Sequence, residues 1–228
     1  MLRYFKGSSL QSSGFAERVW QFRHRHFVER FGWEALRKSD SQEIDSFDTD
    51  DAVHLVLEDA GVVLGYSRLL TTSAPHLLSD VYPEIVNGAA YPCQPDVYEW
   101  TRCVAEPGAR ICGVEASHML LTGVAEFCLS AGIEALIVET HPKLVNLLVS
   151  NLWDVTPLAA PMVYDGALVV PIHAVPSPAA LASHHRGAGI NGSVLELTAD
   201  ASNPVTGQTL TTFVGHAHTG LVEEVSYA

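Results

Sequence analysis

The carboxylates and arginines of this sequence are concentrated where they could bind a charged small molecule. The stretch from Glu43 to Asp51 carries five carboxylates within nine residues, and Arg68 follows among apolar neighbours. An arginine is costly to bury unless a carboxylate pairs with it. These residues predict a charged pocket at the mouth of a sheet. The alternative is an acidic loop in solvent, beside an arginine whose aliphatic stem covers apolar surface.

Two further groups of candidate residues flank this stretch. Arg23 and Phe27 are four residues apart, so they share one face of a helix, and Trp33 follows the end of that helix. Glu99 and Arg102 belong to the strand-like segment EWTR. Positions three apart on a regular strand point to opposite faces. Both side chains can reach one pocket if the strand bulges between them, and bulges are common beside active sites.

The elements that must position these side chains alternate between helical and strand-like patterns. The sequence predicts a helix over 15–31, a hairpin of 53–57 and 62–70, a short helix near 77–82, a strand over 97–104, a helix over 114–130, a strand over 135–139, a helix over 142–151 and a hairpin within 162–170. This order indicates an α/β fold with a mixed sheet and helices on both faces.

The chain changes character after about residue 176, where Pro, Ala, Ser, Gly and Thr dominate. We expect a catalytic domain over 1–175 and a C-terminal extension over 176–228 of unknown role. Within that extension, 194–197 and 210–214 are two further strand candidates.

Composition excludes several classes of protein. The net charge of −13 argues against nucleic acid or an anionic membrane as the main partner, because both require a basic face. An apolar leader and a run of about 18 apolar residues are missing from the sequence, so a cytoplasmic protein is expected. The four cysteines show no CxxC spacing and are expected to be reduced. No HExxH or EF-hand pattern occurs, so no metal is predicted; no GxSxG occurs either, which disfavours a serine hydrolase.

Taken together, these motifs resemble the acyl-homoserine-lactone synthases, the autoinducer synthases of bacterial quorum sensing. The family's pattern is an Arg-x-x-x-Phe with a Trp, a Glu-x-Asp-x-x-Asp-like acidic element, an Arg-Leu-Leu strand end, a Leu-Ser-Asp-Val-Phe-Pro segment and a Glu-x-x-Arg strand. Here these stand, over roughly residues 3–172, as Arg23, Phe27 and Trp33, then EIDSFDTD, SRLL, LLSDVYPE and EWTR. Tyr82 replaces the family's Phe, and Trp100-Thr101 replaces the common Leu-Ser.

The resemblance implies a GNAT-like acyltransferase fold, in which two central strands diverge and hold an acyl thioester in a V-shaped cleft. The strands over 97–104 and 135–139 would flank this cleft. The segment from Arg110 to Glu115 is similar to the GNAT pyrophosphate loop, although its last residue is a carboxylate, which repels a pyrophosphate. The alternative for this segment is a helix start with an acidic first turn.

The chemistry that the resemblance implies joins S-adenosylmethionine to an acyl thioester. The methionine amine attacks the thioester carbonyl, and the methionine carboxylate then closes the lactone and expels methylthioadenosine. Glu99 is the expected base for the amine, directly or through one water. Arg23 and Arg102 are candidates to bind the substrate carboxylate. S-adenosylmethionine is a substrate in this scheme, so no cofactor is expected.

The remaining site residues have supporting roles in the same scheme. Asp45, Asp48 and Arg68 form a network that shapes the site, with Asp48 expected to touch the ammonium group; for Asp45 and Arg68 a purely structural ion pair is the alternative. Phe27 and Trp33 cover the adenine or the sulfonium, with a cation–π contribution. The acyl pocket is expected near Trp100, Met119 and Thr140. The other acidic-loop carboxylates are expected to lie in solvent, namely Glu43, Asp50 and Asp51.

The acyl donor stays open between acyl-coenzyme A and an acyl carrier protein. A carrier protein is acidic and needs a basic docking patch, for which this region offers Arg110 and Lys143. Resemblance to the wider family favours the carrier protein, whereas the sparse positive charge favours coenzyme A, which we place slightly ahead. Two alternative functions remain: a GNAT-type acyltransferase for another amine, and a catalytically silent ligand-binding module. Acyl chain length, its substitution and the oligomeric state are not encoded in any motif of the sequence.

Overall fold

A computed structural model describes residues 1–196. The helices are α1 (Gly7–Ser12), α2 (Ala16–Arg23), the π-helical segment η1 (His24–Arg30), the short η2 (Glu34–Leu36), α3 (Leu77–Asp80), η3 (Pro83–Val86), α4 (Ala116–Ala131), α5 (Pro142–Ser150) and α6 (Pro178–Ala188). The strands are β1 (Leu2–Lys6), β2 (Val53–Asp59), β3 (Val62–Thr71), β4 (Val97–Ala105), β5 (Arg110–Ile111), β6 (Val114–Glu115), β7 (Ala135–Thr140), β8 (Asp154–Pro157), β9 (Met162–Tyr164) and β10 (Ala167–Val175).

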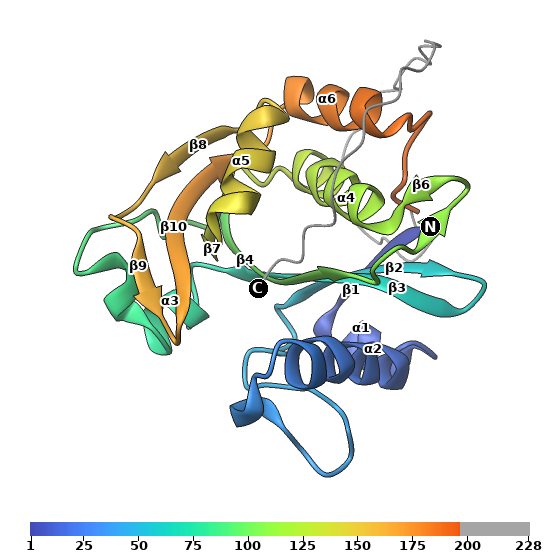
Figure 1. The fold of residues 1–228 in the computed structure, drawn as a ribbon, viewed down its shortest axis with the longest axis horizontal. Helices are drawn as coiled ribbons and strands as arrows, with labels where there is room; N and C mark the ends of the chain where they lie inside the picture. Colours follow the sequence, from blue (N-terminus) through green and yellow to red (C-terminus); the bar gives the residue numbers. More distant parts are fainter. Residues whose placement is uncertain (197–228) are drawn as a thin grey trace.

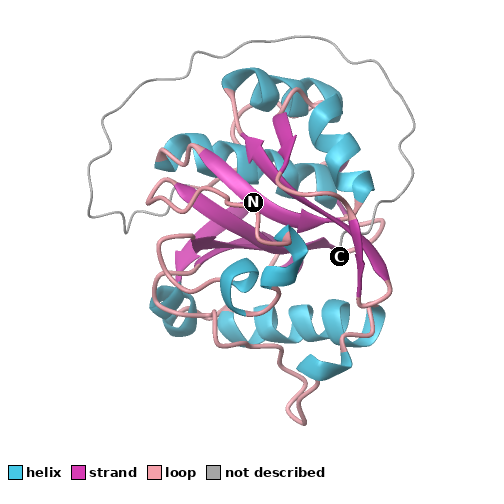
Figure 2. Cartoon of the chain, turned by 90° about the vertical axis from the view of Figure 1, so that its left-hand side faces the viewer, coloured by secondary structure: helices cyan, strands magenta, loops and turns pink. Residues whose placement is uncertain are grey.

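Eight of these strands form one mixed sheet in the order β1-β2-β3-β4-β7-β10-β8, with β9 paired to β10. All neighbours are antiparallel except β4 and β7. Helices α1 and α2 lie on one side of the sheet, and α4 and α6 lie on the other (Figure 1). The turned view in Figure 2 shows the same three layers. The architecture is the mixed sheet with helices on both faces that the element order predicts.

The parallel strands β4 and β7 pair over only three positions. Their register runs from Val97↔Ala135 to Glu99↔Ile137, and then the pairing ends although both strands continue. The antiparallel neighbours on either side stay paired beyond this point. The sheet therefore opens between its two central strands immediately after Glu99, where the V-shaped cleft is expected.

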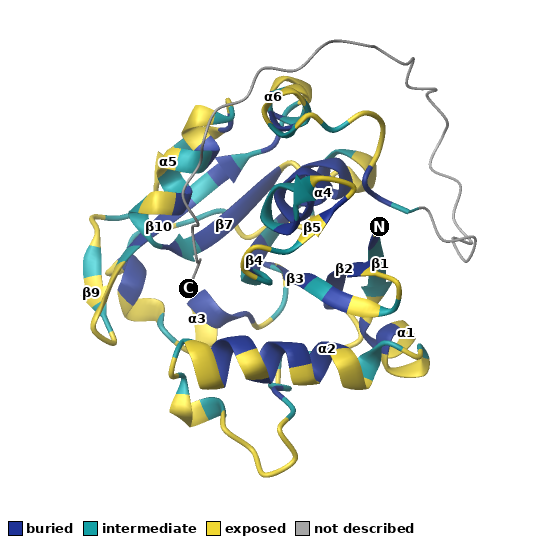
Figure 3. Ribbon diagram, turned by 45° about the vertical axis from the view of Figure 1, so that its right-hand side comes forward, coloured by how far each residue is buried: buried dark blue, intermediate teal, exposed yellow. Residues whose placement is uncertain are grey.

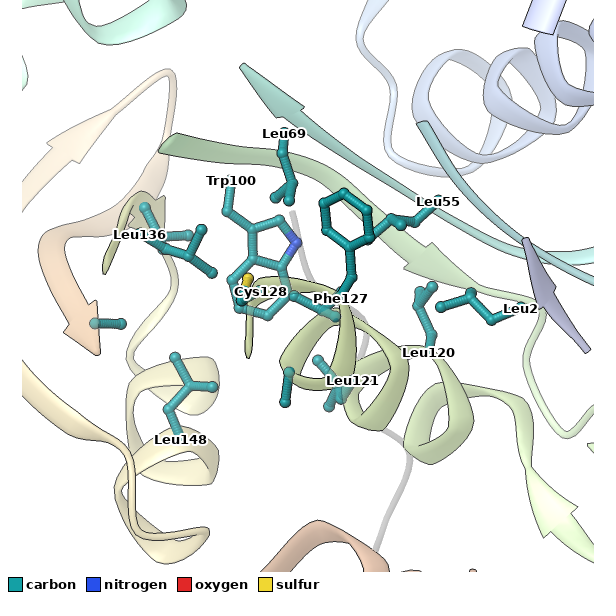
Figure 4. Close-up of a cluster of buried hydrophobic side chains, with 14 of the residues drawn as sticks. Leu2, Leu55, Leu69, Trp100, Leu120, Leu121, Phe127, Cys128, Leu136 and Leu148 are labelled. Carbon is teal, nitrogen blue, oxygen red and sulfur yellow. The ribbon is translucent and has the colours of Figure 1, made fainter. Parts of the chain in front are cut away.

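Successive residues of the central strands face two different environments. Leu69 and Trp100 belong to an apolar cluster that includes side chains of α4, and most of that helix is buried (Figures 3 and 4). Tyr66 and Val104 belong to a second cluster with α2. Because Leu70 pairs with Glu99 and Leu69 with Trp100, Arg68 and Glu99 lie on the α2 face, and Leu69 and Trp100 lie on the α4 face. These two surfaces are called the polar face and the apolar face below.

A β-bulge interrupts the alternation at Arg102. Arg68 pairs with Thr101 but Tyr66 pairs with Val104, so two residues of β4 lie opposite one residue of β3. Arg102 has φ of 57°, which is unusual for a residue with a β-carbon. The extra residue turns Arg102 to the polar face, so the bulge that the EWTR spacing requires is present.

The expected helices and both expected hairpins are present within a few residues of their predicted ends. The two hairpin turns have positive φ at Ala60 and Gly61 and at Asp165 and Gly166, as a two-residue turn between twisted strands requires. Strand β1 is a feature that the sequence analysis missed. No helix within residues 1–196 is long and apolar enough to cross a membrane.

Residues just beyond 175 pack against the body of the protein. Helix α6 contacts α4, and the main chain of Leu2 exchanges hydrogen bonds with Val194 and Glu196. The strand expected over 194–197 is, in its described part, a single bridge between Leu195 and Leu2. The candidate strand over 210–214 lies outside the described residues. The division of the chain at residue 175 stays a prediction.

Candidate active site

Three arginines and three carboxylates form one buried network on the polar face. The arginines come from the end of α2, from β3 and from the bulge of β4, and the carboxylates come from the loop between η2 and β2. The members are Arg23, Arg68, Arg102, Glu43, Asp45 and Asp48. The structure thus brings together side chains that are up to 79 residues apart in the chain, and their formal charges balance.

Arg68 and Arg23 are fully buried, and each is held by two carboxylates. Nη1 of Arg68 lies 2.6 Å from Oδ1 of Asp45 and 2.8 Å from Oδ1 of Asp48. Nη1 of Arg23 lies 2.7 Å from the same Asp48 oxygen, and its Nε donates to Glu43. Asp48 therefore bridges the two arginines, which compensates much of their desolvation cost.

The pKa values of these carboxyls follow from the same contacts. Burial alone would raise the pKa of Asp48, but the attraction of Arg23 and Arg68 outweighs it and holds that pKa well below its usual value. The pKa of Asp45 is lowered in the same way, with Arg68 as the main cause opposing burial. The pKa of Glu43 is lowered because Arg23 and Arg102 outweigh its burial. All three carboxylates are thus ionised at neutral pH.

Arg102 occupies the more accessible edge of the network. Its Nη2 lies 3.0 Å from Oδ2 of Asp45, and its guanidinium lies 5.0 Å from the ring of Trp33 and 5.4 Å from that of Phe27. These two rings stack with their centroids 5.0 Å apart. Among the carboxylates, Asp45 has the most exposed side chain, at 12%. Arg102 and Asp45 are therefore the least buried charged members of the network.

Three members of this region were not identified from the sequence. The expectation that Glu43 lies in solvent is wrong, because its side chain is 1% exposed and paired with Arg23; Asp50 and Asp51 are exposed as expected. Tyr66 accepts a hydrogen bond from Arg23 and contacts Nδ1 of His54 at 2.6 Å. Burial lowers the pKa of His54 to about 4. The alternation of β3 places residue 66 beside Arg68, which is the signal that could have identified Tyr66.

Glu99 lies on the same face but outside the arginine network. Its two carboxylate oxygens accept hydrogen bonds from the main-chain N–H groups of Leu77 and Leu78, at 2.8 and 2.6 Å. Glu99 is fully buried, and this burial raises its pKa although the two N–H donors oppose the shift. A carboxyl with a raised pKa at the point where the sheet opens has the properties of a general base.

The residues expected in the acyl pocket lie on the opposite, apolar face. Trp100 and Met119 belong to the α4 cluster, and Figure 4 shows the Trp100 ring beside Leu136, Cys128 and Phe127. The Trp100 indole donates to Oγ of Ser67 at 2.6 Å. Thr140 is buried at the end of β7, and its hydroxyl has no hydrogen-bond partner within residues 1–196. Glu99 and Trp100 are thus neighbours in sequence that serve different faces.

Comparison with known proteins shows which family the chain belongs to. The family described as "Autoinducer synthase" matches residues 7–174. The chain belongs to the autoinducer synthase family. The isovaleryl-homoserine lactone synthase of Bradyrhizobium diazoefficiens is 31% identical over 151 residues, which are 66% of this chain and 68% of the relative. The acyl-homoserine-lactone synthase of Ralstonia solanacearum is 31% identical over 153 residues, which are 64% and 75% of the two chains.

A solved structure extends the likeness to the fold. The CoA-dependent synthase BjaI, crystallised with SAM and isopentyl-CoA, superposes with a TM-score of 0.78 at 26% identity, covering 86% of this chain and 92% of that chain. The predictions of an acyl-homoserine-lactone synthase and of a GNAT-like mixed α/β fold are therefore confirmed. The roles of individual residues in this synthase stay predictions.

In the loop before α4, the charged side chains pair with each other. Nη2 of Arg110 lies 2.6 Å from Oε1 of Glu115, and Nη1 donates to the carbonyl of Gly113 at 3.0 Å. Both groups are substantially exposed. Because the carboxylate already pairs with the arginine, this loop offers little net positive charge to a pyrophosphate.

Proposed function

We propose that this synthase acylates S-adenosylmethionine on the polar face with an acyl group held on the apolar face. The two substrates meet where β4 and β7 stop pairing. One observation carries the proposal: Glu99 is the last residue of β4 that pairs with β7, and on its other side it pairs with Leu70, two residues from Arg68 of the network. In this reaction the amine attacks the thioester carbonyl and forms the amide while the C–S bond breaks and the thiol leaves, and the methionine carboxylate then displaces methylthioadenosine to close the lactone.

Arg102 and Asp45 are the proposed contacts to the zwitterionic end of S-adenosylmethionine. Arg102 suits the carboxylate better than Arg23 does, because Arg23 is completely buried and already held by Glu43 and Asp48. Asp45 suits the ammonium better than Asp48 does, because the Asp48 side chain is only 2% exposed. Arg23, Asp48 and Arg68 then hold the accessible pair in position.

Phe27 and Trp33 are the proposed cover for the nucleoside or sulfonium. Their stacked rings lie beside Arg102, and Trp33 is partly exposed. Aromatic rings attract a cation within about 6 Å of the ring centroid. The π-helical segment η1 carries Phe27, and such segments are frequent at functional sites.

Glu99 is the proposed base for the amine. A free α-amino group has a pKa of about 7.7–8.0, so a modest base suffices to remove its proton. Glu99 combines a raised pKa with a position at the opening of the sheet. Since both its oxygens already accept N–H donors, its second lone pairs are the ones available to the substrate or to one bridging water.

Trp100, Met119 and Thr140 are the proposed walls of the acyl pocket. All three are buried on the apolar face, beside the strands that diverge. Hydrophobic contacts distinguish one methylene by only about 1–3 kcal/mol. Thr140 offers a hydroxyl without a partner, which could bind an oxygen on the acyl chain.

Acyl-coenzyme A is the proposed donor. The high-scoring structural neighbours BjaI and MesI are described as CoA-dependent, each with a TM-score of 0.78. Arg110 is already paired with Glu115, which leaves Lys143 of the two cations available for docking an acidic carrier protein. A synthase with this substrate pair is expected to work in the cytoplasm, where both substrates are made.

The test of the donor compares kcat/KM for one acyl group presented on coenzyme A and on acyl carrier protein, at two salt concentrations. We expect a preference for coenzyme A. A clear preference for the carrier protein that weakens with salt would contradict the choice, because salt screens electrostatic docking.

The test of the reaction is incubation with S-adenosylmethionine and a panel of acyl thioesters, followed by mass spectrometry. We expect an acyl-homoserine lactone and methylthioadenosine in equal amounts. Acylation of another amine without methylthioadenosine would favour the general acyltransferase. Ligand binding with no product would favour the silent module.

A further inference from the structure

A second carboxyl, Glu139 on β7, lies beside Glu99. Glu99 pairs with Ile137 in the parallel ladder, and Glu139 is two residues further along β7. Residues two apart on a strand share a face, so both carboxyl groups point to the polar face across the position where pairing ends. The register therefore places the Glu139 carboxyl next to that of Glu99. The two residues are called the carboxyl pair below.

The surroundings of Glu139 favour its neutral form. Although the residue as a whole is partly exposed, its Oε1 is inaccessible to solvent and has no hydrogen-bond partner among the described residues. Burial raises the pKa of Glu139 well above its ordinary value, and the neighbouring charge of Glu99 raises it further. Glu99 differs, because the N–H groups of Leu77 and Leu78 stabilise its ionised form. Two carboxyls in one site cannot both ionise readily, and here the donors decide which one does.

Other titratable groups face the carboxyl pair from the neighbouring elements. Tyr82, between α3 and η3, is a neutral phenol whose pKa is raised first by burial and then by the pair; its ring contacts that of Tyr164 on β9 at 5.7 Å. His76 and Arg68 act on Glu99 and favour its charge. His173 of β10 shares the face through its pairing with β7. The positively charged groups of this region therefore favour ionisation of Glu99 rather than of Glu139.

We propose that Glu139 is a positioning residue for the base, a neutral carboxylic acid that donates a hydrogen bond to the Glu99 carboxylate. This inference rests on the proposed role of Glu99. The donated bond holds Glu99 ionised and oriented at neutral pH in a site whose burial would otherwise favour its protonated form. Glu139 itself contacts Glu99 and not the reacting atoms. Its role is to donate a hydrogen bond, so any neutral hydrogen-bond donor of the same shape can replace it.

The first experiment compares Glu139→Gln, which keeps a neutral donor, with Glu139→Met, which removes it. One hydrogen bond to a charged group is worth about a tenfold effect or somewhat more. We expect Glu139→Gln to retain kcat within about threefold, because its amide N–H replaces the acid O–H. Glu139→Met should lose about tenfold in kcat at pH 7, and the acidic limb of its pH profile should move up by about one unit. Glu134→Met, at an exposed position just before the same strand, is the matched control.

A mutant cycle tests whether Glu139 acts through Glu99. In the Glu99→Gln background, Glu139→Met should have no further effect on kcat, because residues that act as one unit are not additive. The KM for S-adenosylmethionine should change by less than about twofold in all variants, since uniform substrate binding is untouched. Equal losses in both backgrounds, or an inactive Glu139→Gln beside a folded protein, would overturn the proposal.

A second experiment does not depend on activity. A group whose pKa is raised by folding stabilises the protein fully below its unfolded pKa, and this contribution is lost as pH rises toward the folded pKa. The unfolding free energy of the wild type should therefore fall more steeply above about pH 5 than that of Glu139→Gln, by about one proton. Equal slopes would show that Glu139 is ionised and would overturn the inference even if the synthase reaction stands. If the slopes differ but the protein has no synthase activity, the neutral state of Glu139 is supported and only the proposed function is refuted.

Discussion

The polar and apolar faces of the central strands are stabilised in opposite ways. On the apolar face, Leu69 and Trp100 pack against α4 in a cluster that excludes water. On the polar face, Arg68 is equally buried, yet it depends on Asp45 and Asp48 for compensation of its charge. A hydrophobic core tolerates changes that conserve volume, whereas a buried ion network tolerates none that removes a single charge. Binding a zwitterionic substrate requires the less tolerant arrangement.

The difference is clearest between adjacent residues of β3. Arg68→Met keeps much of the side chain's length but removes the charge, and it should lower the unfolding free energy by about 3–5 kcal/mol. Leu69→Met, the matched control on the apolar face, should cost less than about 1.5 kcal/mol. Urea unfolding of both variants measures the two effects. Similar costs at the two positions would contradict the contrast between the faces.

Acid should act mainly on the polar face. The pKa values of Glu43, Asp45 and Asp48 are lowered by the arginines, so these carboxylates stabilise the protein above their unfolded pKa values. That contribution is lost as pH falls from about 4 toward the lowered folded values. Unfolding free energies measured from pH 5 downward should therefore fall steeply. Asp48→Asn should show a shallower fall, and an unchanged slope in that variant would argue against an ionised Asp48.

The smallest expected effect is a change in protection on ligand binding. S-adenosylmethionine should slow hydrogen exchange over residues 23–50, because Phe27 and Trp33 would close over it. Helix α4, on the other face, should exchange at the same rate with and without the ligand. High protection over 23–50 that the ligand leaves unchanged would reject a closing cover.

The sequence predicts much of this molecule because local pattern and charge pairing agree. Alternation places Arg68 on one face of its strand, and the EWTR spacing requires a bulge if Glu99 and Arg102 are to reach one pocket. Arg68 lies among apolar neighbours and therefore needs a carboxylate partner, and the acidic loop offers several. What the sequence does not specify is which carboxylate pairs with which arginine, because the loop before β2 has no periodic structure.

The errors have the same origin. Glu43 lies in a loop without periodic structure, and its burial depends on where the chain crosses Arg23. Glu139 lies in the strand expected over 135–139, and its place beside Glu99 becomes apparent only when β7 is paired with β4. Strand β1 lies at the edge of the sheet, and its pairing with β2 depends on the tertiary fold.

The separate tasks of the two faces can be tested most directly with the neighbouring residues Glu99 and Trp100. kcat/KM would be measured for a series of acyl chain lengths with Glu99→Gln and with Trp100→Phe. Glu99→Gln should lower turnover by roughly 10²–10⁴ for every chain length alike, because it affects proton removal. Trp100→Phe should change the preference among chain lengths while the KM for S-adenosylmethionine stays the same. If both variants changed acyl preference, or if Glu99→Gln kept near-normal turnover in a folded protein, the assignment of proton transfer to one face and acyl binding to the other would be contradicted.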